Sequence, residues 1–317
     1  MNTYLKYKPA WLQLVVFGSL TFGSYLALGL VAFYGVSASL GLSFDELQAM
    51  DTSNPRVLTA QKWLQALLSV AIFLVPSLLF AYLSDRRPLR FLGHKSPHPA
   101  GFWWIGIAVL LVAFPAASWL NQVNQQMHLP ASMKATEDLL RAAELRVNEQ
   151  MKAFLDMNSF GDLLTMLLVM AVLPAICEEI FFRGILQRIF IQISRRPWIG
   201  IIISAFLFSA FHGQFFSFFP RLLLGILLGA VFWYSGSIWP AILGHFVNNA
   251  IQVVMVYRDK SFIDQEPVME PMVVVISVLA IVGLVYYMRK ISHTHFGELY
   301  DTDDDLILPS HRNHNDQ

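Results

Sequence analysis

The sequence predicts an all-α, polytopic membrane protein with about eight transmembrane helices. Hydrophobic residues make up 56% of the 317 residues and charged residues only 14%, whereas soluble domains average about 25% charged residues. Apolar runs long enough to cross a bilayer, which takes about 20 helical residues, recur along the chain. Basic residues cluster in alternate loops between these runs. Together these observations predict a multi-pass protein rather than soluble domains.

The N-terminal part, residues 1–125, contains the first three predicted spans. They are expected at about 11–34, 63–83 and 101–120. An acidic loop with Asp45 and Glu46 joins the first two, and a basic loop from Arg86 to Lys95 precedes the third. The first span is longer than the apolar core of a signal peptide, so we expect no cleavable leader.

Residues 126–160 are predicted to form an extramembrane loop that contains an amphipathic helix over 133–157. Apolar residues recur there at helical spacing: Leu139, Leu140, Ala143, Val147, Met151, Phe154 and Leu155. Such a stripe favours a helix lying on the membrane surface. The alternative is a lid over a functional site.

Residues 161–292 form the predicted membrane core, with the catalytic part in helices 4 to 7. Its five spans are expected at about 163–193, 198–212, 221–234, 238–257 and 272–288. Pro174 predicts a kink in the long fourth span, and Gly225 and Gly229 have the GxxxG spacing of closely packed membrane helices. Residues 293–317, which are rich in aspartate and histidine, are expected to be a disordered cytoplasmic tail.

The distribution of basic residues predicts the orientation of the chain. With eight spans, the N-terminal head, the Arg86 to Lys95 loop, the pair Arg195 and Arg196, and Arg289 with Lys290 fall on one side. The positive-inside rule makes that side the cytoplasm, with both termini inside and the protein in the cell membrane. Membrane lipids are therefore expected partners, while a net charge of zero argues against nucleic acid.

Charged residues inside the fourth span are the first candidates for function. Glu178, Glu179 and Arg183 interrupt an apolar run, although each charge at bilayer depth costs about 2.5 to 3.5 kcal/mol. Glu179 and Arg183 are four residues apart and predict an ion pair. Glu178 points about 100° away from Glu179, which leaves a carboxylate free to act as a general base. Alternatively, both glutamates are structural or mark a helix end. The single cysteine, Cys177, is expected to be a packing residue.

Two later spans also carry polar side chains. Phe208 and His212 share one helix face, as do His245 and Asn249. At 1.5 Å per residue, Glu178 and His212 lie at similar depths of about 21 to 23 Å, whereas His245 is shallower. A lone histidine in a span is often only a packing residue. Taken together, however, the residues match a glutamate and a histidine that activate water, with a second histidine and an asparagine that stabilise an oxyanion.

The motifs EExxxR at Glu178 to Arg183, FxxxH at Phe208 to His212, and HxxxN at His245 to Asn249 carry a family resemblance. In this order they resemble the CAAX-protease and bacteriocin-processing (CPBP) family of intramembrane peptidases, over residues 160 to 255. The resemblance implies an eight-helix core and a glutamate-dependent endopeptidase. In it, Glu178 and His212 would activate water, and His245 and Asn249 would form the oxyanion site. Glu179 with Arg183 would hold the geometry.

The resemblance also bears on cofactors and substrate. Members of the family are often described as metalloproteases, and Glu178, His212 and His245 could ligate zinc. The sequence contains no HExxH motif, and a water held by glutamate and histidine needs no metal, so no cofactor is expected. By analogy, the expected substrate is the C-terminal region of a peptide that is lipidated or otherwise tethered to the membrane. Two other functions stay open: a proton- or ion-coupled transporter, and a non-catalytic scaffold or immunity protein.

Overall fold

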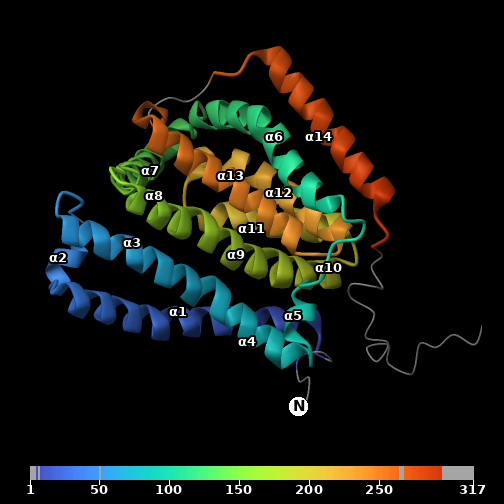
Figure 1. The fold of residues 1–317 in the computed structure, drawn as a ribbon, viewed down its shortest axis with the longest axis horizontal. Helices are drawn as coiled ribbons and strands as arrows, with labels where there is room; N and C mark the ends of the chain where they lie inside the picture. Colours follow the sequence, from blue (N-terminus) through green and yellow to red (C-terminus); the bar gives the residue numbers. More distant parts are fainter. Residues whose placement is uncertain (1–4, 6–7, 50, 264–267, 295–317) are drawn as a thin grey trace, which may run out of the picture.

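A computed structural model of the chain describes residue 5 and residues 8–49, 51–263 and 268–294 (Figure 1). Every regular element in these ranges is a helix, which confirms the all-α prediction. The N-terminal helices are α1 (Ala10–Leu40), α2 (Phe44–Gln48), α3 (Pro55–Ser69), η1 (Val70–Leu74), α4 (Val75–Ser84), α5 (Pro88–Phe91) and α6 (Phe102–Gln125). The extramembrane loop holds η2 (Ala131–Met133) and α7 (Lys134–Phe154).

The C-terminal part continues the helical bundle. Its first elements are α8 (Phe160–Leu167), η3 (Leu168–Val172), α9 (Leu173–Glu179), η4 (Ile180–Gln187) and α10 (Arg188–Ser194). They are followed by α11 (Pro197–Phe211), η5 (Phe215–Ser217), α12 (Phe218–Ser235), α13 (Trp239–Arg258), η6 (Lys260–Ile263) and α14 (Pro271–Ile291). Most of the tail, residues 295–317, lies outside the described residues, so its predicted disorder stays a prediction.

Six helical segments of the described chain are long and apolar enough to cross a membrane, which supports the multi-pass prediction. They are Ala10–Leu40, Pro55–Ser84, Phe102–Gln125, Phe160–Ser194, Phe215–Ser235 and Pro271–Ile291. The two remaining predicted spans correspond to α11 and α13. The 15 residues of α11 reach about 22 Å at 1.5 Å per residue, and α13 has 20 residues, several of them polar. The count of eight spans therefore stays a prediction, as do the domain boundaries.

The helices are arranged in layers (Figure 1). The antiparallel pair formed by α1 and the α3–α4 segment covers one side of the long α8–α10 segment. The other side of that segment packs against α11 and α13, while α6 contacts α12, α13 and α14. The predicted core helices thus lie between the N-terminal pair and α6. This layering buries Glu179, Arg183 and Phe208 in protein.

The fourth span contains two π-helical stretches, η3 before Pro174 and η4 directly after Glu179. Pro174 has no N–H to donate and would clash with the preceding turn of a regular helix. The wider π turn of η3 precedes it at the point where a kink was predicted. π-Helical turns are frequent at functional sites, and here one of them begins next to the paired glutamates.

Glycines permit the closest helix contacts. A Cβ atom on Gly106 of α6 would lie 2.2 Å from the backbone oxygen of Pro240 in α13, so the two backbones meet directly. The predicted GxxxG contact is present: a Cβ on Gly225 would lie 3.0 Å from Ala205, and one on Gly229 would lie 2.7 Å from the Gln187 side chain. The small glycines therefore bring α12 against α11 and the fourth span.

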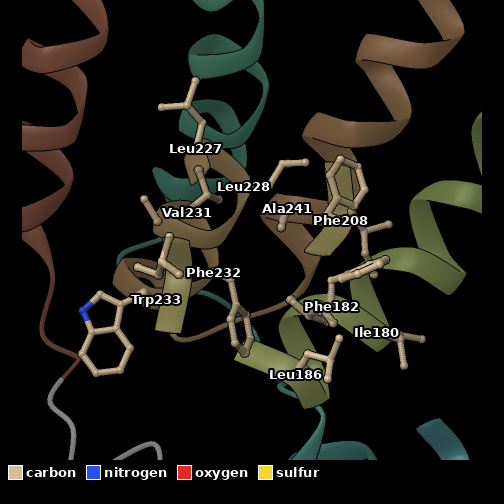
Figure 2. Close-up of a cluster of buried hydrophobic side chains, with 14 of the residues drawn as sticks. Ile180, Phe182, Leu186, Phe208, Leu227, Leu228, Val231, Phe232, Trp233 and Ala241 are labelled. Carbon is tan, nitrogen blue, oxygen red and sulfur yellow. The ribbon is translucent and has the colours of Figure 1, made fainter. Parts of the chain in front are cut away.

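Apolar side chains fill the space between η4, α11, α12 and α13 (Figure 2). Phe182 and Phe208 meet edge to face with ring centroids 5.2 Å apart. Both rings are at most 5% exposed. This aromatic contact joins the first motif segment to the second, so the apolar core continues up to the polar residues of the candidate site.

The amphipathic helix α7 packs against the loop that follows His212. Glu144 of α7 accepts hydrogen bonds from the Phe216 N–H (3.1 Å) and the Ser217 hydroxyl (2.8 Å). The Arg141 guanidinium stacks 3.8 Å from the centre of the Phe216 ring. Leu139 remains exposed, as a helix at a membrane surface would require. Protein contact and an exposed apolar face are thus combined in one helix.

Candidate functional site

The carboxylate of Glu179 lies at the centre of the candidate site. Its Oε1 atom is 2.9 Å from Nη1 of Arg183 and 2.8 Å from Nδ1 of His245. Glu179 and Arg183 are almost fully buried, and His245 is 6% exposed. The ion pair within the fourth span was predicted from the spacing. The contact with His245 of α13 was not, because it joins residues 66 positions apart.

Arg183 is fixed by further contacts. Its Nη2 atom donates to the backbone oxygen of Gly225 (3.1 Å). One turn later, the Gln187 amide donates to the oxygen of Gly229 (3.0 Å). The GxxxG glycines allow this, because larger side chains would keep the α12 backbone out of reach. A buried guanidinium needs such partners to offset the loss of hydration.

Phe208 links the two histidines to Arg183. Its ring centre lies 4.7 Å from the Arg183 guanidinium, 5.0 Å from the His212 ring and 6.0 Å from the His245 ring. The Phe208 and His212 rings, which share one helix face, are therefore in contact. A cation over an aromatic face is a stabilising contact, so the Phe208 ring contributes to holding the Arg183 guanidinium in place.

His212 ends α11 and remains exposed, whereas Glu178 at the end of α9 is partly buried. Nδ1 of His212 lies 2.8 Å from the Phe208 carbonyl oxygen. Since a carbonyl can only accept, Nδ1 carries the proton, and a neutral ring keeps a free lone pair on Nε2. No direct hydrogen bond joins Glu178 to His212 in the described chain. The common water-binding role of this pair remains a prediction.

Asn249 is oriented by a contact that Pro174 makes available. In a regular helix, residue 174 would donate its N–H to the carbonyl of residue 170, but proline has no N–H. The Asn249 amide nitrogen donates to this same Met170 oxygen (3.1 Å). The Asn249 oxygen accepts from the Asn248 amide (3.1 Å). One N–H of the Asn249 amide is thus left for another acceptor.

The residues of the site were also tested as a zinc site. No group of three or more His, Cys, Asp or Glu side chains in the described ranges is arranged to hold a metal ion. One ring nitrogen of His212 is held by the Phe208 carbonyl and one of His245 by Glu179. Metal-bound histidines have such partners too, so these contacts do not decide whether Glu178, His212 and His245 could ligate zinc. Metal independence of a reaction stays a prediction.

Three residues near the site were not singled out from the sequence. Arg221 lies at the start of α12, Asn248 precedes Asn249, and Glu144 holds the loop between α11 and α12. Arg221 and Asn248 line the same cavity between α6, α12 and α13. The position of Arg221 at the start of an apolar span could have identified it from the sequence. The roles of Asn248 and Glu144 could not be identified in this way, because they depend on contacts between distant segments.

Comparison with known proteins agrees with the motif positions. Residues 160–251 match the family model described as "Type II CAAX prenyl endopeptidase Rce1-like". The match begins with α8, ends in α13 and includes all three motifs, but it covers less than a third of the chain. No curated protein and no solved structure matches the chain. Residues 160–251 are therefore similar to the type II CAAX prenyl endopeptidases, as the three motifs predicted.

Proposed function

We propose that this protein is an intramembrane endopeptidase that hydrolyses a peptide bond in a membrane-associated, lipidated peptide. The observation that carries the proposal is the convergence of the three motifs on Glu179, which contacts Arg183 and His245 while Phe208 touches both of them and His212. Burying polar side chains such as Glu179, Arg183, His212 and His245 within membrane-spanning helices costs free energy, so such residues usually have a function. The family match over residues 160–251 supports the same reaction class.

In the proposed mechanism, Glu178 and Nε2 of His212 hold one water molecule. Glu178 takes a proton from this water as its oxygen attacks the carbonyl carbon of the substrate. The carbonyl double bond opens, and the oxygen becomes an oxyanion. The tetrahedral intermediate then collapses as Glu178 returns the proton to the leaving nitrogen. The products are a new carboxylate and a new amine, and no covalent enzyme intermediate forms.

His245 and Asn249 would stabilise the oxyanion. Because Nδ1 of His245 donates to Glu179, its Nε2 can donate to substrate only when the ring is a doubly protonated imidazolium. The Glu179 carboxylate lies 2.8 Å from Nδ1 and would be the counter-ion of this form. With Glu178 and Glu179 ionised, Arg183 and the imidazolium bring the net charge of these four groups to zero. The free N–H of Asn249 would supply the second donor.

Glu179, Arg183 and Phe208 would act as positioning residues. They connect the fourth span to α11, α12 and α13 through contacts that are buried in protein. In this mechanism they contact the reacting side chains and not the substrate. The protein itself would lie in the cell membrane, with both termini in the cytoplasm, as the distribution of basic residues predicts.

A comparison of peptide termini tests the proposal. Membrane fractions from cells with the wild-type chain or the Glu178→Gln variant would be analysed for new protein C-termini by mass spectrometry. We expect at least one C-terminus that depends on Glu178. Glu149→Gln, at an exposed position of α7, is the matched control and should leave the set of termini unchanged. Identical termini in all three samples would contradict the proposal, and vectorial solute flux lost in Glu178→Gln liposomes would favour a transporter.

A further inference from the structure

A cavity of about 290 Å³ lies between α6, α12 and α13, next to the candidate site. Phe114 and Leu224 supply apolar wall, and Asn248, Gln252 and Ser217 supply polar groups. Asn248 also donates to Asn249, so one wall of the cavity is in contact with a proposed oxyanion residue. A volume near 300 Å³ is at the lower end for small-ligand pockets, enough for a short piece of a larger substrate.

Arg221 is the charged residue among those that line this cavity. Its guanidinium is partly buried, and its hydrogen bonds go to neutral acceptors, the Ser217 carbonyl (3.2 Å) and the Gln214 side chain. Within the described chain, no carboxylate lies within ion-pair distance of Arg221. A buried cation is normally paired, and a guanidinium suits a carboxylate by its fork of donors.

Two carboxylates of this part of the protein have other roles. Glu144 accepts from the Phe216 N–H and the Ser217 hydroxyl, which holds the loop before α12, the helix that carries Arg221. Glu178 is assigned above to the activation of water. No acidic residue lines the cavity, so a bound anion would meet the Arg221 cation together with the amide donors of Asn248 and Gln252.

We propose that this cavity binds a carboxylate of the peptide substrate, with Arg221 as the specificity-determining residue. The inference rests on the proposed peptidase function and names a recognition group for it. The carboxylate could be the C-terminus of the peptide or an acidic side chain close to the cleaved bond. In either case, a negative charge at Arg221 would hold the peptide in the cavity that Asn248 connects to Asn249.

The test uses the full chain in lipid nanodiscs and three S-farnesylated CAAX peptides. One has a free C-terminal carboxylate, one has a C-terminal amide, and one has the amide together with a glutamate as its last residue. We expect kcat/KM for the preferred acidic peptide to exceed that for the neutral amide by about 10- to 100-fold, the range of a hydrogen bond to a charged group. Arg221→Gln should bring the ratio close to one, mainly through KM, whereas Arg146→Gln should preserve it.

A binding measurement separates failure of this inference from failure of the proposed function. In a Glu178→Gln background, the same peptides are titrated and their Kd values compared with and without Arg221→Gln. If binding is selective for a carboxylate and depends on Arg221, but the wild type cleaves none of the peptides, the inference is supported and the proposed peptidase function is contradicted. Cleavage without selectivity, or selectivity unaffected by Arg221→Gln, would overturn the inference alone. Loss of selectivity only when anionic lipid is added would assign the cavity to a lipid headgroup and also overturn it.

Discussion

Nδ1 of His245 donates to Oε1 of Glu179 across 2.8 Å, between helices that are far apart in the sequence. The same oxygen contacts Arg183 at 2.9 Å. The Glu179 carboxylate therefore fixes the orientation of the His245 imidazole and also balances the positive charge of Arg183. This arrangement resembles the outer-shell partners that orient functional histidines in other sites. It leaves Nε2 of His245 as the ring nitrogen that can meet a substrate.

Replacement of Glu179 by glutamine should separate orientation from chemistry. The amide keeps the shape of the side chain but removes the negative charge beside His245 that the proposed mechanism requires, so we expect kcat to fall by about 10- to 100-fold with little change in KM. Thermal unfolding in detergent should also occur at a lower temperature, because Arg183 would be buried without its counter-ion. Wild-type kcat in Glu179→Gln would contradict the positioning role. Glu149→Gln serves as control.

Pro174→Ala tests the contact between Asn249 and Met170. The variant adds an N–H that can donate to the Met170 carbonyl and compete with the Asn249 amide. The loss of one hydrogen bond predicts a decrease in kcat of about 3- to 10-fold, with an unchanged or higher Tm. Pro115→Ala, within α6, is the matched proline control and should leave kcat unchanged. A normal kcat in Pro174→Ala would mean that Asn249 does not depend on this carbonyl.

The crossing of α6 and α13 should not tolerate a side chain at Gly106. A Cβ there would lie 2.2 Å from a backbone oxygen, which a rotamer change cannot relieve. We expect Gly106→Val to cost at least about 1 to 3 kcal/mol of stability, measured as a lower Tm in detergent. Gly283→Val in α14 is the control, since nothing lies within 4 Å of a Cβ at that position. Equal Tm values for the two variants would contradict the close crossing.

The contacts that Glu137 makes at the start of α7, with Arg141, the Leu129 N–H and His128, should weaken at low pH. The Arg141 side chain, the Leu129 N–H and the His128 ring lower the pKa of Glu137 from 4.5 to about 2. A lowered folded-state pKa stabilises the fold above the unfolded value, and this contribution is lost as pH falls from about 4.5 through about 2. Hydrogen-exchange protection of the Leu129 amide should fall over that interval. The Glu137→Gln variant should lack this step, and the same step in both proteins would contradict the assignment.

The proposed orientation can be tested with single cysteines. Cys177 is buried, so the wild-type chain should resist a membrane-impermeant maleimide. Ser132 lies before α7 and Ser96 directly follows the basic loop, and both positions are exposed in the wild-type chain. In intact cells we expect Ser132→Cys to react and Ser96→Cys to react only after permeabilisation. The reverse pattern would place the basic loops outside and contradict the proposed topology.

The sequence was informative where the interactions are local. Long apolar runs predicted the spans Ala10–Leu40, Phe102–Gln125 and Pro271–Ile291 within a few residues, because the bilayer sets the length of a helix. The cost of charge in lipid singled out Glu178 and Glu179. The spacing of four residues then predicted the ion pair between Glu179 and Arg183. These inferences require only helix geometry and solvation energies.

The contacts between helices were decided by the tertiary structure. Glu179 with His245, Asn249 with Met170, and Arg183 with Gly225 each join residues more than 40 positions apart. They depend on the rotation of each helix about its axis and on how closely two backbones approach. The simple depth count placed His245 too shallow to meet the glutamates, yet it bonds to Glu179. By itself, then, the sequence determined which side chains must avoid lipid, because the cost of charge in lipid depends only on the residue type and its helix face. Only the packing of the helices determined which of these side chains meet, because a contact also requires a partner at a defined position on another helix.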